Sequence, residues 1–359
     1  PGWRKMRKWM RPNAERGAIF NLCSATLGAG ALSLPYAFRE AGVGTAIILL
    51  LVCAGLTAFS IRLLLLARKH TGLTTYEDMA STLYGRCFAL FLEINMLLFC
   101  FGCAVGYIVA LSDLVEPFVR FFPATSLLPC KDWITIGVWA VVLLPLSLVK
   151  EVSSLQCTST LGIVALAVLV VFVFGHMVLH LFDTGVSFRG LVEQIDWFHY
   201  SSLGVLNALP IMLFAFSCQL NVYSIQSELE VPTMARMSRI MKGAIAICLS
   251  VYLTIGVGGY IEFQTTTKGN ILLNYDPAAE PVMLIPFLGI TLTVLMAFPM
   301  NIFPCRYTLN ELVFHVLPEM YAETKRVRHS AGKHRAVADD VAAAGELSFM
   351  YRYISRESC

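Results

Sequence analysis

Apolar segments about 20 residues long recur along this chain and limit what it can fold into. Eight can be traced, covering residues 17–40, 43–67, 87–116, 133–149, 155–182, 202–226, 237–262 and 282–305. A helix of about 20 apolar residues crosses the roughly 30 Å hydrocarbon core of a bilayer. Inside that core, only helices and closed barrels satisfy every backbone N–H and C=O group. The pattern therefore predicts an all-α polytopic membrane protein.

The composition supports this class and argues against an enzyme. Hydrophobic residues make up 57% of the chain and charged residues 14%, whereas a typical soluble domain carries about 25% charged residues. A membrane enzyme would need titratable groups clustered at one depth, and the spans carry only isolated acids. We expect no catalytic residues, cofactor or resident metal. The net charge of +3 is not gathered on one basic face, so we expect no nucleic-acid partner; the lipid bilayer is the expected surrounding.

Lysine and arginine residues set the predicted orientation. Six of them precede the first span: Arg4, Lys5, Arg7, Lys8, Arg11 and Arg16. The positive-inside rule places this segment in the cytosol, and eight spans return the chain to the same side. We therefore divide the chain into a cytosolic basic segment (1–16), a transmembrane domain (17–310) and a cytosolic polar tail or loop (311–359) that we expect to be truncated.

Two of the predicted spans carry interruptions at corresponding places. The first contains Gly28-Ala29-Gly30 and then Pro35; the sixth contains Pro210 and then FAFSC, residues 214–218. A broken helix persists in a membrane only where it lines a protein or water cavity. Small residues also serve close helix packing, so the glycines alone leave both roles open. Paired interruptions are the sequence pattern of a transporter binding site, and together they predict a solute site.

Three strings resemble the amino acid/auxin permease family: FNLCSATLGAGALSLPYAF (20–38), ALPIMLFAFSCQLNVYSIQSEL (208–229) and TLTVLMAFPMNIFPCR (291–306). That family includes the animal neutral amino acid transporters and the protozoan amino acid permeases. The resemblance covers about residues 15–310. It implies a leucine-transporter-like inverted-repeat fold of eleven spans, with the substrate between broken helices 1 and 6. The chain carries about eight spans, so we expect an incomplete scaffold.

The resemblance also implies which residues hold the substrate. The unwound part of helix 1 comprises Thr26, Leu27, Gly28, Ala29 and Gly30, and its counterpart in helix 6 comprises Phe214, Ala215, Phe216 and Ser217. Tyr107, in the third span, is placed near the substrate. Glycine lets backbone N–H groups approach a carboxylate closely, and exposed carbonyls accept from an amine. For Tyr107 and the two phenylalanines, simple packing remains open.

The coupling ion is a separate expectation. A sodium site in this fold would draw on Ser24, Leu27, Thr291 and Thr293, since hard cations favour oxygen ligands. One turn further the chain has Met296 and Ala297, where the sodium-binding pattern usually supplies hydroxyls. Sodium-coupled relatives of the animal type also tend to have Asn at the Ser24 position. These departures favour proton coupling or facilitated exchange over sodium.

Two further features invite functional interpretation. Glu93 is an acid within the third span, which favours either a functional site or a buried or snorkelling carboxylate. His176 and His180 lie one turn apart, a spacing that can bind a metal or sense pH. No third ligand accompanies them, so two interfacial histidines are the simpler interpretation.

The predicted function is secondary transport of amino acids by alternating access. One alternative is an amino-acid-binding sensor or receptor of the same fold without net transport; another is a truncated, non-transporting product. Neutral, cationic and aromatic amino acids and polyamines all stay open as substrates. So do the plasma membrane and an endolysosomal or vacuolar membrane.

Overall fold

The computed structural model describes residues 15–73, 75–120, 131–148, 155–185, 195–198, 202–227, 233–277 and 280–316, together with residues 190, 193 and 229. Within these ranges the secondary structure is helical and contains no strand, which confirms the all-α prediction. The predicted terminal segments 1–16 and 311–359 lie almost wholly outside the described residues. Residues up to 305 form one compact unit, and that unit holds the site described below.

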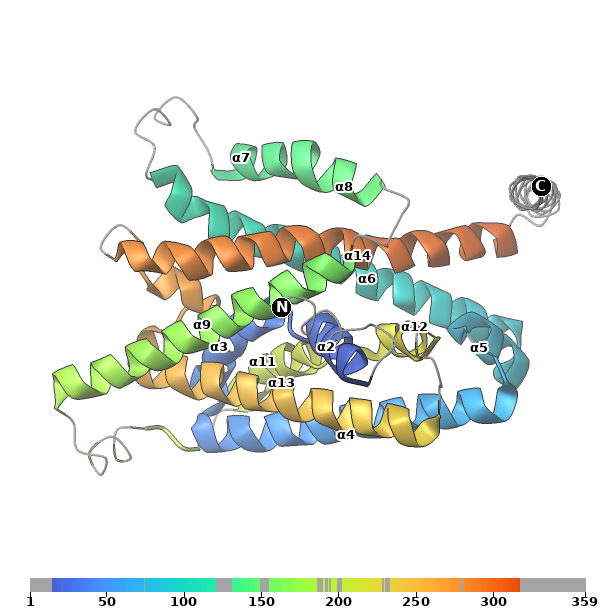
Figure 1. Cartoon of the computed structure of the whole chain (residues 1–359), viewed down its shortest axis with the longest axis horizontal. Helices are drawn as coiled ribbons and strands as arrows, with labels where there is room; N and C mark the ends of the chain where they lie inside the picture. Colours follow the sequence, from blue (N-terminus) through green and yellow to red (C-terminus); the bar gives the residue numbers. More distant parts are fainter. Residues whose placement is uncertain are drawn as a thin grey trace, which may run out of the picture. The chain divides into compact units, whose positions relative to one another are not determined.

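Among the described residues, six helices are long and apolar enough to cross a membrane. They are α4 (Val43–Thr71), α6 (Arg86–Arg120), α9 (Leu155–Thr184), α11 (Ser202–Ala215) with its continuation, α13 (Met234–Phe263) and α14 (Leu284–Val316). The first predicted span is a bent pair, α2 (Glu15–Thr26) and α3 (Leu34–Ala41), joined through the 3-10 helix η1 (Ala29–Ser33). The pair bends by 56° and makes a seventh span (Figure 1).

The predicted span at 133–149 is the shortest of the eight. The structure has a shorter apolar helix, Trp133–Ser147, built from α7 (Lys131–Val138), a π-helical segment η3 (Trp139–Leu143) and α8 (Leu144–Leu148). Pro145 lies in α8 and has no N–H, so the carbonyl four residues earlier cannot be paired in the usual way. A π-helical turn is one way in which a helix adjusts to such a break in its hydrogen-bond ladder.

Shorter elements connect the spans. They are α5 (Tyr76–Tyr84), η5 (Gln219–Asn221), α12 (Val222–Ser227), η6 (Gln264–Thr266), η7 (Ile271–Asn274) and η8 (Pro281–Met283). Local residues set several boundaries: Pro35 lies in the first turn of α3, where its missing N–H is harmless. Gly72 ends α4 in the left-handed conformation (φ 72°), and its N–H donates to the Arg68 carbonyl.

Helix α13 is the central packing element of the described bundle. It packs against α2, α3, α4 and α9, and in Figure 1 it runs beside α4. Two glycines allow this approach: a Cβ atom at Gly256 would lie 2.5 Å from the Phe38 ring, and one at Gly259 would lie 2.7 Å from Pro35. Close backbone approach through small residues is typical of helices that pack in a membrane.

The outward-facing side chains fit a lipid environment. Phe101 is 67% exposed, Val171 68% and Phe182 78%. A soluble monomer rarely leaves large apolar side chains uncovered over a wide surface. Together with the seven helical spans, this confirms a polytopic membrane protein.

Candidate functional site

The first helix is interrupted where the glycines predicted it. Helix α2 ends at Thr26, where the Leu27 N–H still donates to the Cys23 carbonyl (2.7 Å), but the Gly28 N–H turns back to the Thr26 carbonyl (3.0 Å). The 3-10 helix η1 then starts at Ala29. The N–H groups that begin a helix have no acceptor inside it, so the start of η1 places such donors at the break.

The sixth span is interrupted in the same manner. Helix α11 ends at Ala215, and two tight turns follow, in which the Ser217 N–H donates to the Phe214 carbonyl (3.0 Å) and the Cys218 N–H to the Phe216 carbonyl (2.9 Å). Helical structure resumes in η5 and α12. The break therefore falls within residues 214–218, as predicted.

The two breaks are in direct contact. A Cβ atom added at Gly30 would lie 3.1 Å from the Ala215 Cα and 3.3 Å from the Phe214 ring. Only a residue without a side chain leaves the two backbones this close. The position of the second break therefore favours a glycine at residue 30 in the first break.

A tyrosine from a third helix also joins the breaks. The Tyr252 hydroxyl, on α13, lies 2.8 Å from the Thr26 carbonyl and 2.6 Å from the Ala215 carbonyl. Tyr252 is fully buried, and the Phe216 ring packs edge-on against it at 5.1 Å between centroids. Sequence reasoning missed this residue. The available signal was a tyrosine in an apolar helix, whose hydroxyl needs a partner when buried.

A cavity of about 100 Å³ lies beside the two breaks. Eight of the residues predicted to bind substrate or ion line it: Ser24, Thr26, Gly28, Gly30, Tyr107, Phe214, Ala215 and Ser217. Sequence reasoning did not include the polar Asn221 and Asn301 or the apolar Phe99 and Cys103 in the same wall. One water needs roughly 10–15 Å³ measured in this way, so the cavity has room for several waters or a small solute.

A second cavity, of about 630 Å³, adjoins the first. The two share Gly30, Tyr107 and Phe214 in their linings, and the second also contains Asn270 and Asp113. Asp113 lies within the predicted 87–116 span and was overlooked as an acid. Gly30, Tyr107 and Phe214 therefore lie between two spaces, and Tyr107 and Phe214 are the side chains that separate them.

Some predicted residues lie outside these linings. Leu27 and Phe216 are buried, and Phe216 packs on Tyr252 instead of facing the cavity. Only the backbone of Ala29 is described. The binding roles of all these residues remain predictions.

The predicted ion-coupling residues are only partly brought together. A Cβ atom at Gly162, on α9, would lie 3.3 Å from Thr293 and 4.0 Å from the Ser24 hydroxyl, so both side chains border the same glycine. The Thr293 hydroxyl donates to the Gly289 carbonyl (2.9 Å). Thr291 stands two positions earlier on the helix, and residues so spaced face different sides. Thr293 is thus the better placed of the two threonines.

The histidine pair has different partners from those its spacing suggested. One ring nitrogen of His176 lies 3.6 Å from a Glu262 carboxylate oxygen, and the other lies 3.4 Å from Glu280. The Tyr275 hydroxyl donates to Glu262 (2.7 Å). In the part of the chain that the structure describes, no group of three His, Cys, Asp or Glu residues is arranged to hold a metal ion. Glu93, the other predicted acid, is fully buried in α6.

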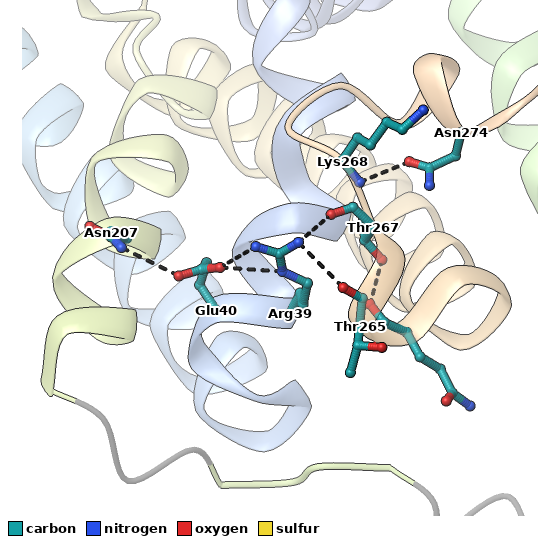
Figure 2. A network of polar contacts seen from close by, with 8 residues as sticks. Arg39, Glu40, Asn207, Thr265, Thr267, Lys268 and Asn274 are labelled. Carbon is teal, nitrogen blue, oxygen red and sulfur yellow. Dashed lines mark hydrogen bonds and ion pairs between the residues drawn. The ribbon is translucent and has the colours of Figure 1, made fainter.

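A polar network joins the end of α3 to the connection that follows α13 (Figure 2). The Arg39 guanidinium donates to the Thr267 carbonyl (2.7 Å) and pairs with Glu40 (2.7 Å), which accepts from Asn207 on α11 (3.3 Å). Lys268, in the same connection, donates its N–H to the Asn274 side chain (2.8 Å). The network ties the first and sixth spans to the connection after α13.

Comparisons with known proteins agree with this architecture. The family model for transmembrane amino acid transporter proteins matches residues 14–341. Vacuolar amino acid transporter 7 of Saccharomyces cerevisiae is 29% identical over 82% of this chain and 59% of its own length. Solute carrier family 38 member 10 of Mus musculus is 28% identical over 83% of this chain and 27% of its own length. Amino acid transporter AVT6B of Arabidopsis thaliana is 26% identical over 87% of this chain and 71% of its own.

The chain spans less than two thirds of the length of the yeast and mouse relatives. The family model nevertheless covers most of the chain and both helix breaks. It also agrees with the resemblance seen in the three sequence strings. This chain therefore belongs to the transmembrane amino acid transporter protein family.

Proposed function

We propose that this chain carries amino acids across a membrane by alternating access, with the substrate held between the breaks in spans 1 and 6. The observation that supports this most directly is the contact between Gly30 and Ala215 beside a cavity lined by both breaks. Broken helices at the membrane midplane hold the charged groups of transported solutes. The names of the relatives, which are amino acid transporters, support the same substrate class.

The first break suits the carboxylate of an amino acid. The N–H groups at the start of η1 and the dipole of the half-helix favour an anion. Gly28 keeps the approach open, because a Cβ atom there would already lie 3.4 Å from the Tyr107 hydroxyl. That hydroxyl is therefore close enough to the same backbone to donate to a bound carboxylate.

The second break suits the amine. Helix α11 ends at Ala215, and a helix C-terminus carries partial negative charge, which favours a cation. Ser217 and Asn221 add polar atoms to the cavity wall, while Phe214 and Phe99 supply apolar surface for a side chain. The cavity thus combines a donor end, an acceptor end and an apolar wall.

The two adjoining cavities fit alternating access. Tyr107 and Phe214 separate them, so a rotation of either ring would connect the site with the larger cavity. The Arg39 network holds the connection after α13, whose residues Gly269, Asn270 and Leu273 line that larger cavity, and it would have to loosen if the connection moves to open the cavity. We propose that the N-terminus is cytosolic. The relatives named as vacuolar transporters support an endolysosomal or vacuolar membrane.

Uptake into proteoliposomes tests the proposal. The purified chain is reconstituted, and uptake of radiolabelled amino acids is measured with competition by each of the other amino acids and by a polyamine. Saturable, concentrative uptake is the expected result. Saturable binding without flux would identify a sensor, and the absence of both would contradict an amino acid site in this chain.

A further inference from the structure

The C-terminal ends of two half-helices converge on one side chain. Helices α2 and α11 end at Thr26 and Ala215, and the carbonyls of those two residues both lie within hydrogen-bond distance of the Tyr252 hydroxyl. The last carbonyls of a helix have no partner within it, and both helix ends carry partial negative charge. A buried acceptor left unpaired is costly, so the two breaks need a shared donor at this point.

Tyr252 supplies that donor without carrying a charge. A phenol has a single O–H hydrogen, yet distances of 2.8 and 2.6 Å are both within the range for O–H···O bonds. The hydrogen can therefore pass from one half-helix to the other by rotation about the C–O bond alone. The ring stays fixed because it is buried and packs edge-on against Phe216.

We infer that Tyr252 is a positioning residue of the solute site, which holds the two helix breaks in the arrangement that binds substrate. It contacts the breaks from behind, through the carbonyls of Thr26 and Ala215, while other parts of the same residues line the cavity. Without the hydroxyl, the half-helix ends would sample several arrangements, of which only some bind. A lower population of the binding state raises the apparent dissociation constant by the same factor.

The transport readout rests on the proposed function and uses a matched pair of variants. Tyr252→Phe removes only the hydroxyl. Tyr260→Phe does the same two turns along α13, where the hydroxyl accepts from the Asp196 N–H (3.4 Å) instead of meeting a break. We expect KM for uptake to rise at least about tenfold in Tyr252→Phe with the maximal rate changed by less than about twofold. Tyr260→Phe should match the unmodified chain, and an unchanged KM in Tyr252→Phe would overturn the inference.

A second readout does not depend on transport. Hydrogen exchange reports the opening of single amides, and the amides of Leu27 and Gly28 in one break and of Ser217 and Cys218 in the other have defined acceptors. We expect exchange in both breaks to rise together, by about tenfold, in Tyr252→Phe and to stay unchanged in Tyr260→Phe. If only the break in α2 responds, or neither does, Tyr252 does not link the two breaks. A chain that transports nothing would refute the proposed function and still leave this comparison decisive.

A third variant keeps the inference testable if Tyr252→Phe does not fold. If Tyr252→Phe is recovered only as aggregate, 4-aminophenylalanine at position 252 keeps the six-membered ring and places an N–H donor where the hydroxyl stands. Recovery of a monodisperse protein with protected breaks would then support the donor role. A 4-aminophenylalanine variant that behaves like the phenylalanine variant would show that the donor is not what matters and would overturn the inference.

Discussion

Gly30 and Ala215 are in backbone contact although 185 positions separate them: a Cβ atom at Gly30 would lie 3.1 Å from the Ala215 Cα. The break in the first span therefore fits against the break in the sixth. A side chain at Gly30 would press on the Ala215 backbone beside the cavity that both breaks line.

Replacing Gly30 should consequently abolish transport without preventing membrane insertion. We expect Gly30→Leu to show no amino acid uptake at normal expression, since its side chain would have to displace the Ala215 backbone and the Phe214 ring. Gly55→Ala on α4 is the control, because a Cβ atom there meets nothing within 4 Å. Unchanged flux in Gly30→Leu would show that the breaks do not form the site.

A tight contact between α13 and α3 should affect the stability of the fold. A Cβ atom at Gly256 would lie 2.5 Å from the Phe38 ring, which is fully buried. Overpacking of this kind costs about 1–3 kcal/mol, so Gly256→Ala should lower the thermal midpoint in detergent. Gly175→Ala, in the open on α9, should leave the midpoint unchanged or slightly raised. Equal midpoints for the two variants would contradict the close approach of α13 to α3.

The spans and breaks could be predicted from the sequence, because length, apolarity and glycine or proline placement are local properties. The helical extent of span 4 could not be predicted in detail, since Pro145 acts through a carbonyl four residues away. The two phenylalanines of the second break show the same limit. Residues 214 and 216 are two positions apart and diverge, so only one could face the cavity, and the pattern did not say which; the structure gives that place to Phe214.

Contacts between segments that lie far apart in the sequence were the main feature that sequence reasoning missed. Tyr252 lies 226 residues from Thr26 and 37 residues from Ala215 in the sequence, and no local pattern predicts that one hydroxyl meets both carbonyls. His176 likewise finds Glu262 and Glu280 instead of its helical neighbour His180. A single sequence identifies residues that need partners and leaves the partners undetermined.

The Arg39 network should control access to the larger cavity. Its guanidinium donates to the carbonyls of Thr267 and Thr265 and pairs with Glu40. Arg39→Gln should therefore loosen the connection and speed up thiol labelling of a cysteine placed at Ala110, which lines that cavity from α6. Lys268→Gln changes an exposed cation of the same connection and should have a smaller effect. Labelling as slow in Arg39→Gln as in the parent would show that the network does not restrain the connection.

Tyr275 should stabilise the same region at every physiological pH. Burial, and next the neighbouring Glu262 carboxylate, raise the pKa of the Tyr275 phenol above its usual range. A phenol whose folded pKa is raised stays protonated, and its contribution is lost only as the pH climbs towards that raised value. Tyr275→Phe removes the 2.7 Å bond to Glu262 and should destabilise the protein both at about pH 6 and at about pH 9, by about 0.5–3 kcal/mol. Thermal melts of Tyr275→Phe measure this loss of stability, with Tyr84→Phe, at an exposed tyrosine, as the control. A loss that vanishes at the higher pH would contradict the prediction.

Sodium should be dispensable for uptake. The hydroxyls of Ser24 and Thr293 flank Gly162, but residue 297, one turn beyond Thr293, is an alanine in this chain, and hard cations favour several oxygen ligands. We therefore expect initial uptake in choline to stay within about twofold of uptake in sodium. Thr293→Val and Thr291→Val form a matched pair on one helix, and neither should change that ratio. If choline abolishes uptake and only Thr293→Val raises the sodium concentration needed for half-maximal rate, sodium is the coupling ion and its site lies between α2 and α14.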